Sequence, residues 1–127
     1  NSDKKFSKTH DAGSPGLSDK TINKILKKKK LLNYKLIKGN VLNTLKPFLK
    51  KYNSRISMLF MDLDVYDPTI FVLNNLYARL NKGGVIICDN FNIVEGETLA
   101  FMEFVKLNKL KINYFDNNRR VAIVIKK

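Results

Sequence analysis

The sequence of 127 residues allows at most one domain and is long enough to bury a reasonable core. Its longest apolar runs have the length of a strand, far below the roughly 20 residues that a membrane-spanning helix needs, so we expect no membrane association. The single cysteine, Cys88, excludes a disulfide framework within the chain and fits a reducing, cytoplasmic setting. The chain begins with Asn1 rather than methionine, which suggests a piece of a longer protein.

The net charge of +13 is distributed unevenly along the chain. Residues 1–55 carry 15 Lys or Arg against 3 Asp, residues 56–103 carry 2 against 7, and residues 104–127 carry 7 against 1. The middle of the chain is therefore acidic within a basic protein. A basic chain is typical of nucleic-acid binding, but no aromatic platform interleaves these lysines and the acidic zone would repel phosphate. Nucleic-acid binding is thus the weaker interpretation.

The N-terminal part is predicted to be a loop followed by helices and one strand. Residues 1–20 are polar and contain two glycines and a proline, which is typical of a mobile loop. The apolar spacing then predicts a helix over about residues 21–32, a short strand over 34–38 and a second helix over 41–51.

The acidic middle of the chain predicts a strand, a helix and a second strand. The nearly continuous apolar run at 56–61 is typical of a strand buried on both faces of a parallel sheet. Asp67 and Pro68 suit the N-cap and the first position of a helix. That helix is expected to end at the glycine-containing segment 81–84, before a buried strand at 85–88.

A helix and a hairpin are predicted for the C-terminal part. Amphipathic spacing indicates a helix over about residues 97–107. Two short apolar segments, 112–115 and 121–125, flank a turn-forming Asp-Asn-Asn stretch and predict an antiparallel hairpin. The alternation of strands and helices therefore predicts an α/β fold with a doubly wound, mostly parallel sheet and a C-terminal antiparallel hairpin.

Acidic side chains follow both of the buried strands. Asp62 and Asp64 come directly after the first, and Asp89 and Asn90 after the second. If these strands are neighbours, Asp62, Asp89 and Asn90 converge outside the carboxyl ends of the sheet, where oxygen ligands suit a hard cation such as Mg²⁺. Each motif taken alone is also a common helix cap or turn former. The two together favour a metal site, with Asp64 as a base or as a support for the ligands.

Three segments resemble the macrocin O-methyltransferase family: Gly-Asn-Val-Leu-Asn-Thr-Leu at 39–45, Met-Asp-Leu-Asp-Val-Tyr-Asp-Pro-Thr at 61–69, and Gly-Gly-Val-Ile-Ile-Cys-Asp-Asn-Phe at 83–91. These metal-dependent enzymes methylate sugar hydroxyls of natural products, and the resemblance covers about residues 35–127. It implies a Rossmann-like fold, S-adenosylmethionine and Mg²⁺ as cofactors, and a small hydroxyl acceptor, with a sugar as the expected class. It also implies Asp62, Asp89 and Asn90 as metal ligands.

The resemblance implies further roles and shows two departures. Asn40 and Val41 are expected near the adenine of the cofactor. Tyr66 is expected either to line the acceptor pocket or simply to pack near the start of a helix. The loop at 1–20, which carries His10, would form a lid. Where macrocin-like enzymes usually carry a second acid, this chain has Asn90, as in the more distant catechol and caffeoyl-CoA O-methyltransferases. The lysine base of the catechol enzymes has no counterpart.

The resemblance also implies that residues 21–127 are the C-terminal half of a methyltransferase domain. The family's strand order is 3-2-1-4-5-7-6, and this chain would begin just before strand 3. It has no Gly-x-Gly-x-x-Gly loop, so two βα units are expected before Asn1 and the fragment alone is expected to be inactive. Open sheet edges would favour pairing between copies.

The expected reaction is methyl transfer from S-adenosylmethionine to a hydroxyl whose pKa is lowered by the bound cation. Asp62 or Asp64 is the predicted base, and His10 is a more remote candidate. The alternatives are a basic nucleic-acid-binding module, whose affinity would fall steeply with salt, and a non-catalytic remnant that acts as a scaffold.

Overall fold

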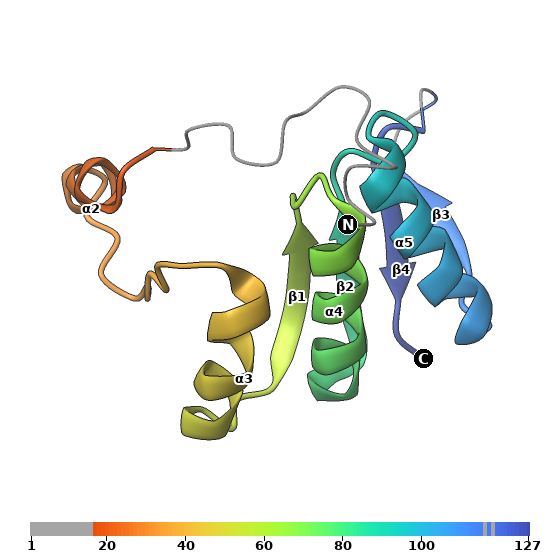
Figure 1. Cartoon of the computed structure of the whole chain (residues 1–127), viewed down its shortest axis with the longest axis horizontal. Coiled ribbons are helices and arrows are strands. Elements are labelled where there is room, and N and C mark those ends of the chain that lie inside the picture. The colour runs from red at the N-terminus through yellow and green to blue at the C-terminus, as the bar shows by residue number, and fades with distance from the viewer. Residues whose placement is uncertain (1–16, 116, 118) are drawn as a thin grey trace.

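The computed structural model describes residues 17–115, 117 and 119–127. In chain order (Figure 1) its elements are α2 (Asp19–Lys28), α3 (Val41–Lys51), β1 (Ile56–Met61), α4 (Tyr66–Leu76), the 3₁₀ helix η1 (Tyr77–Arg79), β2 (Leu80–Cys88), α5 (Glu95–Leu107), β3 (Ile112–Tyr114) and β4 (Ala122–Ile125). The predictions of the helix at 41–51, the strand at 56–61 and the C-terminal hairpin are confirmed.

The four strands of the described residues form one sheet in the order β1-β2-β4-β3. β1 and β2 are parallel, whereas β4 runs antiparallel to both β2 and β3. This order corresponds to the 4-5-7-6 part of the strand order that the resemblance implies. The predicted α/β fold class is confirmed, and within the described part of the chain β1 with β2 is the parallel pair.

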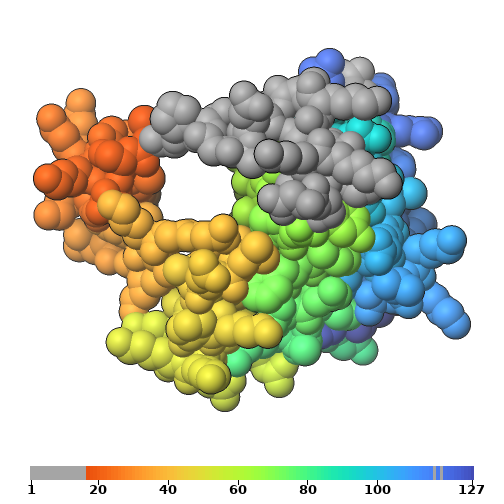
Figure 2. All heavy atoms as spheres, in the orientation of Figure 1, coloured from red at the N-terminus to blue at the C-terminus, as the bar shows by residue number. Residues whose placement is uncertain are grey.

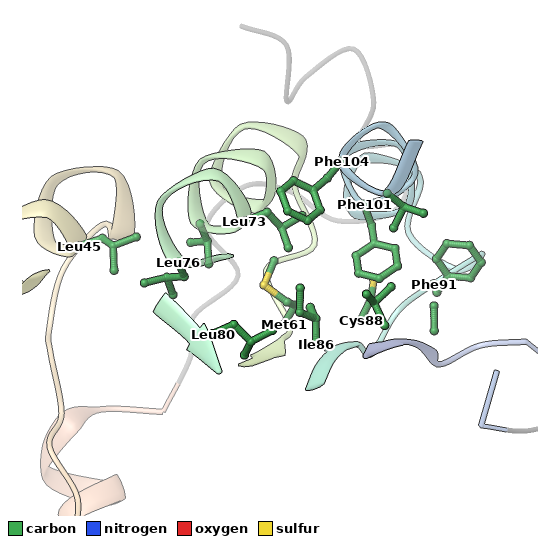
Figure 3. Packing of buried hydrophobic residues seen from close by; sticks show 14 residues of the cluster. Leu45, Met61, Leu73, Leu76, Leu80, Ile86, Cys88, Phe91, Phe101 and Phe104 are labelled. Carbon is green, nitrogen blue, oxygen red and sulfur yellow. The ribbon is translucent and has the colours of Figure 1, made fainter. Parts of the chain in front are cut away.

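Helices α4 and α5 cover one face of this sheet (Figure 1). Figure 3 shows Leu73 on α4 and Phe101 and Phe104 on α5 directed toward Met61 of β1 and Cys88 of β2. All five side chains are buried, and burying each large apolar side chain contributes about 1.5–3 kcal/mol. This core holds α4 and α5 against the C-terminal ends of β1 and β2.

The opposite face of the sheet is apolar and partly open to solvent. Register places Met58, Phe60, Val85, Ile87, Ile123 and Ile125 on this face, which we call the open sheet face. The side chains of Met58 and Phe60 are 62% and 54% exposed. No helix of the described residues packs on this face (Figure 1), so β1 is covered on one face only. The prediction of a strand buried on both faces is therefore wrong for β1.

The predicted strand at 34–38 is not formed, which corrects the sequence interpretation. A strand needs a hydrogen-bonded neighbour. Among the described residues β1 pairs with β2 alone, and the segment at 34–38 pairs with no strand of the sheet. Figure 2 shows α2 and the segment before α3 standing to one side of the body of the molecule. α2 itself begins at Asp19, inside the loop predicted for 1–20, because Ser18 caps it by accepting the backbone N–H of Thr21 at 3.1 Å.

Two helix boundaries also differ from prediction. α4 begins at Tyr66, so Asp67 is its second residue rather than its N-cap. Residues 81–84 belong to β2 rather than to a helix end, because their backbone pairs with the end of the chain: the Gly83 N–H donates to the Lys126 carbonyl at 2.7 Å. Pairing across the sheet thus overrides the local preference of glycine for a helix cap. None of the helices built from the described residues is long and apolar enough to cross a membrane.

Candidate functional site

The site lies where β1 and β2 end side by side. Met61 pairs with Cys88 in the parallel register, and the backbone N–H of Asp89 donates to the Met61 carbonyl at 3.1 Å. Asp62 and Asp89 therefore follow paired positions on neighbouring strands. This arrangement places both acidic motifs at the carboxyl edge of the sheet, where open α/β sheets bind their ligands.

An acidic cluster forms at this edge from Asp62, Asp64 and Asn90. The side-chain Nδ2 of Asn90 donates to Oδ1 of Asp62 at 3.0 Å and to Oδ1 of Asp64 at 3.1 Å. Two carboxylates from the loop after β1 thus converge on one amide from the loop after β2. Asp89 is half-buried beside them, but its carboxylate takes no part in these two bonds. The predicted convergence of Asp62 and Asn90 is present, and Asp64 joins them.

The backbone of Asp64 explains why its carboxylate turns toward Asn90. Its φ of +62° lies in the left-handed region, which Asp adopts more readily than most residues. The preceding residue, Leu63, accepts the backbone N–H of Val65 at 2.7 Å in a tight turn. β1 ends at Met61, and beyond it Asp62 and Asp64 both accept from the side-chain amide of Asn90.

Glu97 lies beneath the cluster and was not singled out from the sequence. It is fully buried in the first turn of α5, and its Oε2 accepts the backbone N–H groups of Leu63 at 3.0 Å and Asp64 at 2.8 Å. Burial raises the pKa of Glu97, and the two backbone donors partly offset that rise. A signal was available in the sequence: Glu97 precedes Phe101 and Phe104 by four and seven residues, on the buried stripe of the helix.

Cys88 completes the contacts of Glu97. Its Sγ lies 3.3 Å from Oε1 of Glu97, and the cysteine side chain has no exposed surface. Burial raises the pKa of the Cys88 thiol, and the neighbouring charges of Glu97 and Asp89 raise it further. The thiol therefore stays protonated and donates to the carboxylate, which makes it a structural group rather than a nucleophile.

Tyr66 follows the acidic loop at the start of α4. Its hydroxyl donates a hydrogen bond to the carboxylate of Glu103 on α5, and this bond raises the pKa of Tyr66. Tyr66 borders an open pocket of about 760 Å³ whose remaining lining comes from α5: Leu99, Met102, Glu103, Val105 and Lys106. That Tyr66 lines an acceptor pocket stays a prediction.

The two residues predicted to lie near the cofactor occupy the start of α3. Asn40 is the N-cap, and its Oδ1 accepts the backbone N–H of Leu42 at 2.9 Å. Val41 is the first helical residue and packs against the core. Their observed contacts are those of a helix start. His10, the remote candidate for a base, lies outside the described residues.

The acidic cluster is not arranged as a metal site in the described part of the chain. Among residues 17–115, 117 and 119–127, no group of three or more His, Cys, Asp or Glu side chains is arranged to hold a metal ion. The cluster instead combines two carboxylates with an amide. The N and O of an amide exchange places by a flip of the side chain, which would turn the Asn90 oxygen toward the position between the carboxylates.

The family model described as macrocin-O-methyltransferase (TylF) matches residues 1–121. This chain belongs to the macrocin O-methyltransferase family. Comparison with curated proteins gives no significant match. The family assignment agrees with the three sequence segments that carry the resemblance.

Solved structures similar to this macrocin O-methyltransferase family member include two methyltransferases. One is the apo structure of CalS11, a TDP-rhamnose 3'-O-methyltransferase in calicheamicin biosynthesis, with a TM-score of 0.64 and 25% identity over 71% of this chain and 41% of that chain. The other is the O-methyltransferase NovP, with a TM-score of 0.75 and 21% identity over 87% of this chain and 46% of that chain. This chain therefore spans less than half the length of both solved chains, and the likeness to NovP shows the shared fold.

Proposed function

We propose that this chain is the acceptor-activating half of an S-adenosylmethionine-dependent O-methyltransferase that acts on a sugar hydroxyl. The observation that carries the proposal is the convergence of Asp62 and Asp64 on Asn90 at the carboxyl ends of two parallel strands. Family membership and the printed activity of CalS11 on TDP-rhamnose support a sugar as the acceptor. A nucleotide-linked deoxysugar is accordingly the first acceptor to try.

The proposed cation site consists of Asp62, Asp89 and Asn90. Two carboxylates and an amide oxygen are ligands that Mg²⁺ prefers, and they leave coordination positions for water and for substrate oxygen. A bound cation would lower the pKa of a coordinated acceptor hydroxyl. The carboxylates of Asp62 and Asp64, both within 3.1 Å of one nitrogen, support the proposal because a cation would relieve the repulsion that two carboxylates so placed exert on each other.

In this scheme Asp64 accepts the proton of the acceptor hydroxyl. Its carboxylate and that of Asp62 accept from the same amide nitrogen, and its backbone lies in the left-handed region. A base within hydrogen-bond reach of the hydroxyl is the geometric requirement for proton abstraction. Holding acceptor and methyl donor in line supplies much of the remaining rate enhancement.

The cofactor requires residues that this chain does not contain. The sequence has no Gly-x-Gly-x-x-Gly loop, and the start of α3, with Asn40 and Val41, would reach only the adenine side of the cofactor. We therefore assign cation binding and acceptor activation to this chain and binding of most of S-adenosylmethionine to the rest of a complete domain.

Calorimetric titration of Mg²⁺ into the full-length protein with S-adenosylmethionine present tests the proposal. We expect saturable binding that is lost in Asp62→Ala and Asp89→Ala. Asp19→Ala is the matched control, because Asp19 is an exposed acid of α2 that pairs with Lys38 at 3.4 Å, away from the sheet. Binding that is absent from the wild-type protein, or that survives in both site variants, would overturn the metal-dependent proposal.

A further inference from the structure

Glu97 joins the two loops that carry the acidic cluster. One of its carboxylate oxygens accepts two backbone N–H groups from the loop after β1, and the other accepts the thiol of the last residue of β2. The partners of Glu97 are therefore part of the acidic motifs or next to them. Leu63 lies between Asp62 and Asp64, Asp64 is itself one of the two acids after β1, and Cys88 immediately precedes Asp89.

The buried position of Glu97 is unfavourable for a carboxylate unless the carboxylate accepts hydrogen bonds from the backbone. It belongs to the buried stripe of α5, where Phe101 and Phe104 pack on the sheet (Figure 3). Burying a carboxylate in such surroundings is costly without hydrogen-bond partners, and an apolar side chain would pack there at lower cost. An apolar side chain would, however, leave the N–H groups of Leu63 and Asp64 without an acceptor in a part-buried place.

The neighbouring residue brings α5 close enough for this contact. Gly96 lies so near the loop that a Cβ at this position would be 2.9 Å from the backbone nitrogen of Tyr66 and 3.2 Å from the carbonyl oxygen of Asp64. The absence of a side chain at 96 and the carboxylate at 97 thus act on the same turn. Together they hold Asp64 in its left-handed conformation, which directs its carboxylate to Asn90.

We propose that Glu97 is a positioning residue that sets the spacing between the β1 acids and Asn90 and so controls cation binding by the cluster. The proposal rests on the proposed function for its link to the cation. Glu97 itself does not touch the cation, the cofactor or the acceptor in this assignment; it acts through the backbone of Leu63 and Asp64. Groups that orient metal ligands in this indirect way typically change metal affinity by about 10–100-fold when they are removed.

Three variants of the full-length protein separate the role of Glu97 from plain stability. Glu97→Gln keeps an oxygen for the two backbone N–H groups and loses the charge, whereas Glu97→Met keeps the volume and loses every acceptor. Val105→Ala, a cavity variant on the buried side of the same helix, is the matched control for lost stability. Thermal unfolding of each variant verifies that it is folded at the assay temperature.

The first measurement is amide hydrogen exchange of the segment at 62–66, which needs no metal. We expect exchange in this segment to rise selectively in Glu97→Met and to stay near the wild-type rate in Glu97→Gln and Val105→Ala. The second measurement is Mn²⁺ binding followed by electron paramagnetic resonance, since carboxylate and carbonyl ligands accept Mn²⁺ as they do Mg²⁺. We expect a loss of about 10–100-fold in Glu97→Met and near-normal affinity in the other two variants.

The outcomes distinguish failure of this proposal from failure of the proposed function. Unchanged exchange in Glu97→Met, or normal Mn²⁺ affinity in that variant, would overturn the positioning role. Equal losses in Glu97→Met and Glu97→Gln would overturn it as well, because the conservative variant keeps the backbone contacts. If the wild-type protein fails to bind Mn²⁺ while the exchange pattern is as expected, the metal-dependent function is wrong and the hold of Glu97 on the loop is supported.

Discussion

Gly96, in the first turn of α5, lies directly against the backbone nitrogen of Tyr66, the first residue of α4. A Cβ added at position 96 would be 2.9 Å from that nitrogen, closer than such contacts are found. Both partners are backbone atoms, so neither can move away as a flexible side chain would. The contact fixes how closely α5 approaches the acidic loop.

Gly96→Ala is therefore expected to destabilise the protein, by about 1–3 kcal/mol, because the new methyl group overpacks a rigid contact. In an unconstrained helix the same change is favourable by about 1 kcal/mol, so the sign of the effect reports the contact. Urea unfolding followed by circular dichroism measures it. Gly83→Ala is the control, since a Cβ there meets nothing within 4 Å and its cost comes only from the positive φ of +77°. A Gly96→Ala protein more stable than wild type would contradict the contact.

Glu97 predicts a pH dependence of stability. Burial raises its pKa in the folded state above the ordinary value of about 4.3 that it has when unfolded. Between the unfolded-state and folded-state pKa values, the folded protein binds more protons at Glu97 than the unfolded protein. The stability that Glu97 protonation contributes is therefore fully present below about pH 4.3 and is lost as pH rises through the folded-state pKa.

Glu97→Gln removes that titration. We expect the free energy of unfolding of Glu97→Gln, relative to wild type, to increase as pH is raised from 4 to 8 in a series of urea denaturations. Glu95→Gln, at an exposed position of the same helical turn, serves as the control and should follow the wild-type curve. Parallel curves for wild type and Glu97→Gln would show that the pKa of Glu97 is not raised.

Cys88 is expected to be unreactive in the folded protein. Its side chain has no exposed surface and burial raises its pKa, so the reactive thiolate is scarce at neutral pH. Labelling with a chromogenic disulfide should be slow for the native protein and rapid after unfolding in urea. Ser57→Cys adds a thiol at an exposed position of β1 as the positive control. Rapid labelling of native Cys88 would mean that the end of β2 opens readily.

Arg79 is expected to stabilise the junction between α3 and the start of β2. Its guanidinium donates to the Leu49 carbonyl at 3.0 Å and to the Tyr52 carbonyl at 2.8 Å, at the C-terminal end of α3. Hydrogen bonds from a charged donor contribute about 1.5–3 kcal/mol to stability. Because Arg79 is partly exposed, we expect Arg79→Met to lower the free energy of unfolding by an amount near the lower end of that range. Urea unfolding measures this loss. Arg55→Met is the control, since Arg55 is exposed and donates to the Ala78 carbonyl at the longer distance of 3.3 Å. Equal costs for the two variants would contradict this assignment.

The open sheet face is expected to make this chain self-associate. The side chains of Met58 and Phe60 are mostly exposed on an edge strand, and exposed apolar strands promote pairing between copies. Met58→Lys with Phe60→Lys should shift the molecular mass measured by light scattering toward the monomer. Leu107→Lys, 70% exposed at the end of α5, is the control and should leave the mass unchanged. Association that persists in the double variant would exclude this face.

Local pattern was sufficient for several elements. The apolar run at 56–61 and the spacing of apolar residues at 41–51 predicted β1 and α3 at their observed bounds, because a short apolar run marks a strand and apolar residues at helical spacing mark one buried helix face. Two short strands around a turn predicted the hairpin for the same reason. The order of acidic residues after β1 and β2 was enough to place both motifs at one edge of the sheet.

Other features depended on contacts between distant residues. The segment at 34–38 has strand-like residues but no neighbour to pair with, and residues 81–84 became strand because Lys126 pairs with them. The sequence marked Asp62, Asp64, Asp89 and Asn90 without showing which side chains meet. That was decided by the left-handed turn at Asp64 and by a buried carboxylate 33 residues away, since the conformation of a turn depends on what accepts its backbone hydrogen bonds.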